Sequence, residues 1–407
     1  EPYRRQRQMC IRDSGYLKND SSLTRKLRHY TYMVLFFVFS MTGAILSSNL
    51  GAAWVFIEGT TLASAYLIYF HKTKHSIEAA WKYVFICSIG IALAFVGIIL
   101  LTIATGNLNS LFYNQLYDNA ALFNQFWLKL SFVFILFGIG TKMGLAPVHF
   151  WLPDAHAEAP SPISALLSAT LLNSAFLMIV NVFRVMVLAG CADYARIMLL
   201  VMGFISLFVT AVFVYHINNY KRMLAYSSIE NMGILAIGTA LGGVGMLAAM
   251  IHLVGHSLIK ASFFLTSGNI LELYGTKKIK SVTGIMKCDR KTGWLWVASF
   301  LGIAAFPPSV LFISEFLMVK TMFIKEHYVL CALFLLLLTI ILFGLGKAVI
   351  KMAFSSGKNE HSAEAENKKL SWTMYAPQII MLILAFVIGI YMPQGFVNML
   401  ILAVRGF

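Results

Sequence analysis

Three lysines, Lys142, Lys260 and Lys347, lie inside apolar runs that are long enough to cross a lipid bilayer. An ammonium group near the middle of a bilayer costs at least about 2.5–3.5 kcal/mol on insertion scales. We therefore expect such residues to bind or move an ion. Lys347 lies close to Lys351 at the basic end of its run, where a long flexible stem also lets the ammonium reach the membrane surface. A purely structural role stays open for it.

Two histidines accompany Lys260 at intervals of four residues, His252 and His256, in the stretch MIHLVGHSLIKASFFL. At about 100° per residue these side chains drift by about 40° per step, so they form one polar stripe along a helix. Imidazole titrates near neutral pH, so the stripe can pass protons through bound water. Histidines at this spacing can also bind zinc. Because the third group is a lysine and no carboxylate shares the face, we predict a proton path and no metal.

Three glutamates lie in apolar surroundings: Glu58 in WVFIEGTTLASAYLIYF, Glu230 in YSSIENMGILAIG and Glu315 in GIAAFPPSVLFISEF. An ionised carboxylate in such a place requires a partner, and we expect Lys142 to be the partner of Glu58. For Glu230 the alternative is a hydrogen-bonded packing role. The predicted proton path contains Glu58, Lys142, His252, His256, Lys260 and Glu315, with Glu230 and Lys347 as further candidates.

Proline interrupts two of the apolar runs, at Pro147 in GTKMGLAPVHFWLP and at Pro307 and Pro308 in GIAAFPPSVLFISEF. A prolyl ring removes a backbone hydrogen bond and clashes with the preceding turn. In lipid, the freed carbonyl groups must find partners inside the protein or in water. Each break has an ionisable neighbour, Lys142 or Glu315, and matching broken helices in two halves are typical of inverted-repeat transporters. The alternative is a pair of ordinary kinks in a packed bundle.

Metal ligands and redox centres are not indicated elsewhere. His149, Asp154, His156 and Glu158 lie close together in PVHFWLPDAHAEAPSP, but they follow the first break, where a partly wet segment can solvate them. We expect them to be structural or gating residues. The five cysteines are scattered without paired spacing, which indicates no disulfide framework, cluster or zinc site.

The elements that must position these groups are membrane helices. Of the 407 residues, 59% are hydrophobic and 12% are charged, and the apolar runs approach the roughly 20 residues that a spanning helix needs. The sequence therefore predicts an all-α polytopic membrane protein with about eleven spans, near 30–49, 53–70, 82–103, 126–149, 162–187, 194–216, 222–241, 245–273, 294–324, 329–354 and 375–400.

The formal charge of +15 could indicate a nucleic-acid partner, but Lys and Arg are concentrated in alternate loops. They collect in the ranges 18–28, 72–74, 221–222, 277–291 and 358–369, while 104–125 contains neither residue. Cationic loops resist translocation, so the basic side is predicted to be cytoplasmic. The partner indicated by this pattern is the lipid bilayer, and no nucleic acid.

The first fourteen residues, EPYRRQRQMCIRDS, contain neither an apolar core nor a small-residue cleavage site, so they are not a signal peptide. The string RRQRQMCIRDS resembles a translated sequencing adaptor. We therefore expect 1–14 to be a non-native segment and the fold, a single transmembrane domain over 15–407, to begin near Gly15. The alternative is a disordered basic tail.

From about Gly15 to the end, the chain resembles the antiporter-like proton-translocating subunits of respiratory complex I, Mrp cation/proton antiporters and membrane-bound hydrogenases. The resemblance rests on WVFIEGTTLASAYLI, GTKMGLAPVHFWLPDAHAEAPSPISALLSATLLN, YKRMLAYSSIENMGI, HLVGHSLIKASFFLTSGNI and FPPSVLFISEF. Within the family, SALLSATLLN, YSSIENMG and GHSLIKASFFL look most like hydrogenase-4 component F, of the formate-hydrogenlyase type.

The resemblance implies a fold of about fourteen helices with two inverted five-helix repeats. These would cover about 30–187 and 194–354, followed by a final helix at 375–400, and about three N-terminal helices would be missing. It also implies that Glu58 pairs with Lys142, that Lys260 is a central channel lysine connected by histidines, and that Glu315 is the terminal site.

Two positions depart from the family pattern. Ser168 and Asn231 stand where relatives often carry histidine. The link from Lys142 to Lys260 is therefore expected to depend on water or on groups such as Asn173.

The predicted function is that of a membrane subunit that translocates protons, or sodium, in a hydrogenase or a complex I-like NADH:quinone oxidoreductase. It would carry no electron-transfer cofactor and would work with other membrane subunits in the inner (plasma) membrane of a prokaryote. One alternative is a stand-alone Mrp-type cation/proton antiporter. Another is a structural anchor whose buried charges only hold helices together.

Overall fold

The computed structural model describes residues 21–406 except 107, 109, 356–360, 362–364 and 367, so the segment 1–14 lies outside the described residues. The described part is helical. Its α-helices are α2 (Ser21–Leu46), α3 (Leu50–Ile68), α4 (Lys74–Thr105), α5 (Tyr113–Asn119), α6 (Gln125–Met143), α7 (Trp151–Glu158), α8 (Ser161–Leu166), α9 (Leu172–Leu188), α10 (Ala192–Phe213), α11 (Tyr220–Leu241), α12 (Val244–Tyr274), α13 (Ile285–Cys288), α14 (Arg290–Ile303), α15 (Val310–Ile324), α16 (Tyr328–Phe354), α18 (Ala376–Ile390) and α19 (Gln394–Val404).

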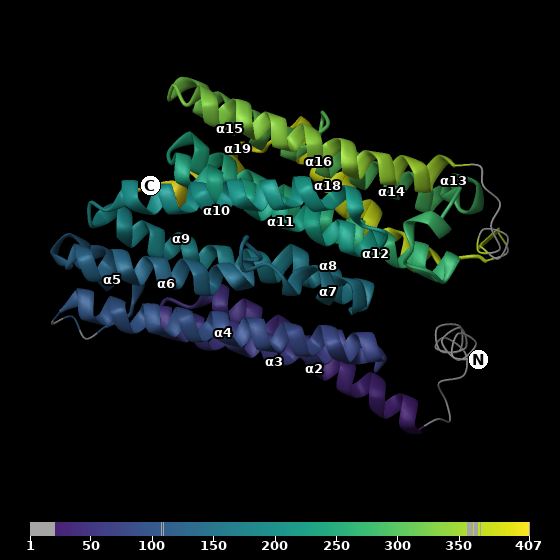
Figure 1. Ribbon diagram of the computed structural model, residues 1–407, viewed down its shortest axis with the longest axis horizontal. Coiled ribbons are helices and arrows are strands. Elements are labelled where there is room, and N and C mark those ends of the chain that lie inside the picture. The colour runs from purple at the N-terminus through teal and green to yellow at the C-terminus, as the bar shows by residue number, and fades with distance from the viewer. Residues whose placement is uncertain are drawn as a thin grey trace.

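The long helices run side by side along the long axis of the molecule (Figure 1), from α2, α3 and α4 on one side to α14, α15 and α16 on the other. Within the described residues, nine helical segments are long and apolar enough to cross a membrane. This confirms an all-α protein with many spans. The predicted span 222–241 is present as α11 but is more polar, because nearly all of its side chains are buried inside the bundle rather than facing lipid.

Both proline breaks are confirmed. The helix α6 ends at Met143, with Gly144 in the left-handed conformation at φ 78°, and α7 begins only at Trp151. The second break separates α14 from α15, which begins after the N-cap Ser309. In each break a side chain satisfies a freed carbonyl: Trp151 Nε1 donates to Thr141 O at 2.7 Å, and Ser309 Oγ donates to Gly302 O at 2.9 Å.

The predicted final helix at 375–400 is wrong in one respect, because the segment forms two helices. The helix α18 ends at Ile390 and α19 begins at Gln394, with Pro393 at its N-cap position. Proline has no backbone N–H and clashes with the preceding turn. It therefore ends one helix and starts the next.

Glycines allow two pairs of neighbouring helices to approach closely. A Cβ atom on Gly138 of α6 would lie 2.4 Å from the backbone nitrogen of Ala94 and 2.6 Å from the carbonyl oxygen of Gly90, both on α4. A Cβ atom on Gly233 of α11 would lie 2.8 Å from the carbonyl oxygen of Gly203 on α10. Small residues at such contacts are typical of helix packing in membranes. The close contact between α4 and α6 places Tyr83 of α4 beside Lys142 of α6.

Candidate functional site

Lys142, in the last turn of α6, is completely buried, is held by one hydroxyl group and also interacts electrostatically with Cys87 of α4. Its Nζ donates a hydrogen bond to the Tyr83 hydroxyl at 2.8 Å and lies 4.7 Å from the centroid of the Tyr83 ring. The Tyr83 hydroxyl also shares a hydrogen bond of 2.6 Å with Ser64 Oγ. We call Ser64, Tyr83 and Lys142 the first cluster.

Glu58, the expected partner of Lys142, forms a different contact. Its Oε2 accepts a hydrogen bond of 3.2 Å from Thr61 Oγ1, one turn further along α3. Glu58 still acts on Lys142 electrostatically, but none of the ion pairs within 4.0 Å among the described residues includes either side chain. The reason is topological: α4 packs against both α3 and α6, and Tyr83 of α4 comes between them. Sequence reasoning missed Tyr83, because a lone tyrosine in an apolar run carries no distinctive signal.

The predicted stripe on α12 is buried, and its members contact α11, α15 and the turn between α8 and α9. Lys260 Nζ donates to the carbonyl oxygen of Leu224 on α11 at 2.8 Å. His252 lies between Asn231 Oδ1 and Ser314 Oγ, each 3.0 Å from one of its ring nitrogens. The stripe therefore connects α11 with α15, and Ser314 is the direct neighbour of Glu315.

Ser168 contacts both the stripe on α12 and a serine of α11. It lies in a π-helical turn, Leu167–Leu171, between α8 and α9, and such turns are frequent at functional sites. Its carbonyl oxygen lies 3.4 Å from His256 Nε2, and its hydroxyl lies 2.8 Å from Ser228 Oγ. Ser228 in turn donates to Leu224 O, the carbonyl that also holds Lys260. The second cluster is Ser168, Ser228, Asn231, His252, His256, Lys260 and Ser314.

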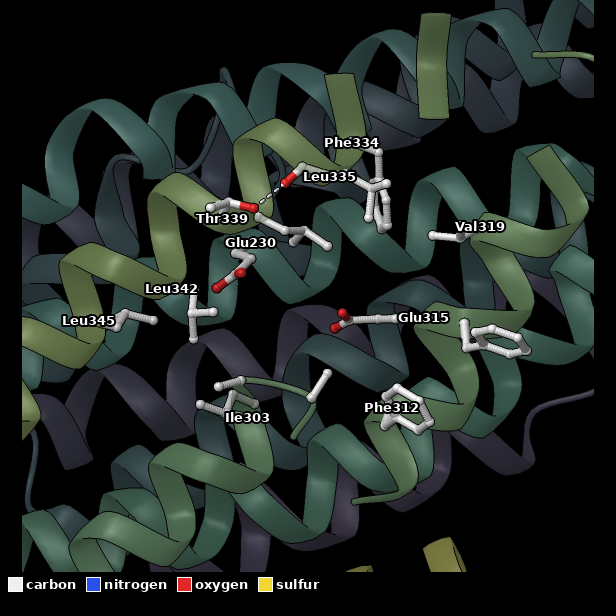
Figure 2. Close-up of a pocket in the computed structure, with 14 residues that line it drawn as sticks. Glu230, Ile303, Phe312, Glu315, Val319, Phe334, Leu335, Thr339, Leu342 and Leu345 are labelled. Carbon is white, nitrogen blue, oxygen red and sulfur yellow. Dashed lines mark hydrogen bonds between the residues drawn. The ribbon is translucent and has the colours of Figure 1, made fainter. Parts of the chain in front are cut away.

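Glu230 and Glu315 line a cavity of about 300 Å³ between α11, the second break, α15 and α16. Figure 2 shows both carboxylates facing the same open space, surrounded by apolar side chains such as Ile303, Phe312 and Leu342. Phe312 and Leu342 are also exposed on the outside of the bundle, so the cavity approaches the surface that lipid would cover. The structure therefore brings these two glutamates together.

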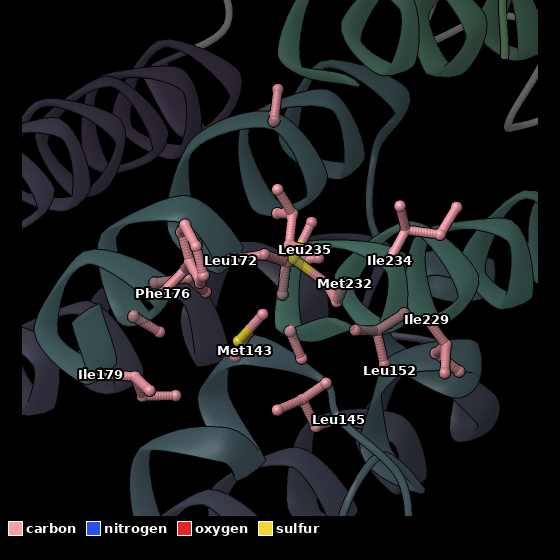
Figure 3. Close-up of a cluster of buried hydrophobic side chains, with 14 of the residues drawn as sticks. Met143, Leu145, Leu152, Leu172, Phe176, Ile179, Ile229, Met232, Ile234 and Leu235 are labelled. Atoms are coloured by element: carbon pink, nitrogen blue, oxygen red, sulfur yellow. The ribbon is translucent and has the colours of Figure 1, made fainter. Parts of the chain in front are cut away.

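Apolar side chains separate the two clusters. In Figure 3, Met143 and Leu145 of the first break pack with Leu172 of α9 and with Ile229 and Met232 of α11. Among the described residues, no direct hydrogen bond joins the first cluster to a side chain of the second. Asn173, which was expected to help link Lys142 with Lys260, donates to Ser257 Oγ of α12 at 2.6 Å. A proton passing between the clusters would need bound water or a movement of side chains.

The remaining candidates lie outside both clusters. Lys347 is exposed on α16, and the structure does not bring it together with the buried groups. Asp154 pairs with Arg222 at 2.6 Å and with Lys82 at 3.3 Å, and Glu158 pairs with Lys277 at 3.3 Å. His156 is buried and stacks on Phe264, with ring centroids 4.6 Å apart. The acids after the first break thus pair α7 with α4, α11 and the loop that follows α12.

Comparisons with known proteins agree with this architecture. Residues 47–342 match the family described as NADH:quinone oxidoreductase/Mrp antiporter, transmembrane. The hydrogenase-4 component F homolog of Methylacidiphilum infernorum is 36% identical over 380 residues, which cover 91% of this chain and 78% of that protein. A Na⁺/H⁺ antiporter subunit of Alkalihalophilus pseudofirmus is 26% identical, over 89% of this chain and 73% of that protein.

A solved structure shares the fold. A chain of the membrane-bound sulfane sulfur reductase, an archaeal respiratory membrane complex, superposes with a TM-score of 0.85 at 22% identity, covering 98% of this chain and 79% of that chain. The family match and the relative at 36% identity confirm the resemblance expected from the sequence. This chain belongs to the NADH:quinone oxidoreductase/Mrp antiporter family of membrane subunits.

Proposed function

We propose that this chain is an ion-translocating subunit of a hydrogenase- or complex I-like respiratory complex. It moves protons, or sodium, while partner subunits carry out the redox chemistry. The observation that carries the proposal is the burial of Lys142, Lys260 and Glu230 inside a bundle of this family. Intramembrane ionisable groups are costly and mark ion pathways.

The two inverted repeats, about 30–187 and 194–354, are part of this proposal. Asn49 and Asn219 cap the first turns of α3 and α11, and each forms an isolated antiparallel bridge with a residue far along the chain, Phe112 and Lys278 respectively. Phe112 directly precedes α5, whereas Lys278 shortly precedes α13, and these helices lie at opposite ends of the bundle (Figure 1). A repeated motif at opposite ends supports an inverted arrangement.

The basic end of the bundle is proposed to face the cytoplasm. His71, which follows α3, experiences the charges of Lys26, Lys221 and Lys277, which come from three other segments. Basic groups from loops far apart in the sequence thus gather at one end. This gathering supports the positive-inside orientation.

In the proposed mechanism, charge changes at the first cluster control proton affinity at the second. A change in the interaction between Glu58 and Lys142 alters the electrostatic field at Lys260. Lys260 then exchanges protons with the cavity at Glu315 through hydrated His252 and His256. The contact of His252 with Ser314, beside Glu315, supports this direction of transfer.

The test is substitution in the complex purified with its partner subunits. Lys142→Ala and Lys260→Ala are expected to abolish ion translocation per electron in proteoliposomes, measured with a pH-sensitive dye and with radioactive sodium, while the complex still assembles. Lys351→Ala, at an exposed position on α16, serves as the control and should translocate normally. Retained translocation in the Lys142 and Lys260 variants would refute the proposal.

A stand-alone cation/proton antiporter is the second candidate, favoured by the similarity to the Na⁺/H⁺ antiporter protein of Alkalihalophilus pseudofirmus. It would use the same buried charges without a redox partner. Copurification separates the two. An active monomer isolated without redox subunits would establish the antiporter and exclude the complex subunit.

A further inference from the structure

Tyr83 is positioned to control Lys142 directly. Its side chain is completely buried, and its hydroxyl is bonded on one side to the Lys142 ammonium and on the other to Ser64. The ring packs edge-on against Trp151, the first residue of α7, with centroids 4.9 Å apart. Tyr83 thus contacts the helix that carries Lys142, the helix that carries Glu58 and the segment beyond the first break.

The position of Ser64 on α3 shows where the Tyr83 hydroxyl, which holds the Lys142 ammonium, lies along that helix. Ser64 and Glu58 lie on the same helix, six residues apart, which corresponds to about 9 Å along the axis. Because α3 runs toward the basic loop at Lys72, the Tyr83 hydroxyl, which binds both Ser64 and the Lys142 ammonium, lies on the basic side of Glu58. The four-carbon stem of lysine is flexible enough to carry its ammonium between neighbouring groups.

We propose that Tyr83 and Glu58 are alternating partners of Lys142, and that Tyr83 is the positioning residue of the conformation seen in the structure. In this conformation the phenol holds the ammonium through a hydrogen bond of 2.8 Å, and none of the ion pairs among the described residues joins the ammonium to the Glu58 carboxylate. When the contact opens, the ammonium moves along α3 and forms the ion pair with Glu58. The inference rests on the proposed function. In it, Lys142 alternates between two states, the contact with Tyr83 and the ion pair with Glu58.

The two states differ in the group that binds the Lys142 ammonium. A phenol is a neutral acceptor, whereas a carboxylate carries a full negative charge, so the pair with Glu58 cancels the charge of Lys142 and the contact with Tyr83 leaves it in place. Removing either partner biases the equilibrium toward the other state and slows a cycle that must visit both. Trp151 ties this equilibrium to α7 through its contact with Tyr83.

The test uses Tyr83→Phe, which removes the hydroxyl and keeps the ring against Trp151. Loss of one charge-assisted hydrogen bond is expected to slow ion translocation by roughly tenfold or more. Ser64→Ala, which removes only the second hydrogen bond of the phenol, should slow it by about three- to fivefold. Tyr274→Phe is the matched control, because that buried hydroxyl donates to Thr283 O and Cys288 Sγ, away from the lysines.

A second measurement separates a positioning role from simple packing. The infrared carboxylate band of Glu58, identified by its loss in Glu58→Gln, is expected to shift in Tyr83→Phe because Lys142 then pairs with Glu58. Translocation within twofold of the unsubstituted complex would overturn the proposal, and so would slow translocation with an unshifted band. If Lys142→Ala stops translocation but Tyr83→Phe does not, only the role of Tyr83 fails. If Lys142→Ala translocates normally, the proposed function itself fails.

Discussion

The first and second clusters hold buried charges in different ways. At the first cluster, Lys142 is bonded to the neutral hydroxyl of Tyr83, at the interface where α4 and α6 approach at backbone distance. At the second, the chain of contacts ends beside Glu230 and Glu315, which face a cavity of about 300 Å³. A cavity of this size can hold several waters. The cavity beside the second cluster therefore has room for water, whereas the first cluster must change its side-chain contacts to pass a charge.

The largest effect is expected from a substitution that forces α4 and α6 apart at the first cluster. In Gly138→Ala the new methyl group would meet backbone atoms of α4, which cannot move aside. We expect a loss of about 3 kcal/mol in stability, measured by thermal unfolding of the complex in detergent. In Gly140→Ala, two residues along α6, the new methyl group would make only ordinary contacts, with the end of Met202 at 3.5 Å and with Leu145 at 3.8 Å. This control should unfold at or above the original temperature, and an equal loss in both variants would contradict the tight packing.

Filling the cavity tests the second region. Val319 lines the cavity, and Val319→Phe should occupy space needed by water and slow ion translocation by roughly tenfold, or about 1.4 kcal/mol. The measurement is ion translocation per electron in proteoliposomes. Val329→Phe, on the exposed surface of α16, should leave the rate unchanged. Normal translocation in Val319→Phe would mean that ions do not use the cavity.

A smaller effect on ion translocation is expected from a substitution of Ser168 in the π-helical turn. Ser168→Ala removes the hydroxyl bond to Ser228 but keeps the backbone carbonyl that faces His256. Loss of a neutral hydrogen bond costs about 1 kcal/mol, so translocation should fall by about fivefold. Ser168→His, which introduces the imidazole that the family resemblance led us to expect at this position, is expected to keep or improve the rate. A rate unaffected by Ser168→Ala would remove Ser168 from the path.

The smallest effect is expected at Lys347. Because its side chain is exposed and lies in neither cluster, Lys347→Ala should translocate within about twofold of the unsubstituted complex, as exposed lysines contribute little. The same proteoliposome measurement decides this. A loss comparable to that of Lys260→Ala would place Lys347 on the path.

Features that depend on local chemistry could be predicted from the sequence. Proline beyond the first turn of a helix ends or kinks it, so both breaks at Pro147 and Pro307–Pro308 were expected. The stripe of His252, His256 and Lys260 follows from helical spacing alone. The same local rule applies at Pro393. The prediction of one final helix over 375–400 did not take this proline into account and was wrong.

Features that depend on which helices are neighbours could not be predicted. Glu58 and Lys142 were expected to touch because both are charged, but the sequence does not reveal that α4 packs between their helices. Tyr83 and Ser228 carry no unusual local signal, and their importance arises only from what lies across the interface. The π-helical turn at Ser168 likewise depends on its surroundings rather than on a helix-breaking residue.

The close approach of Gly138 to α4 has a mechanical consequence. Two helices whose backbones touch resist sliding and rotation, so α4 and α6 should behave as one stiff strut. Lys142 lies at the end of this strut, and the helix first ends beyond it, at the left-handed Gly144. We therefore expect motion that accompanies a change of charge at Lys142 to appear at the contacts that hold α7 to the strut, which are Trp151 with Thr141 O and Asp154 with Lys82. Trp151, at the start of α7, would transmit this motion to Tyr83.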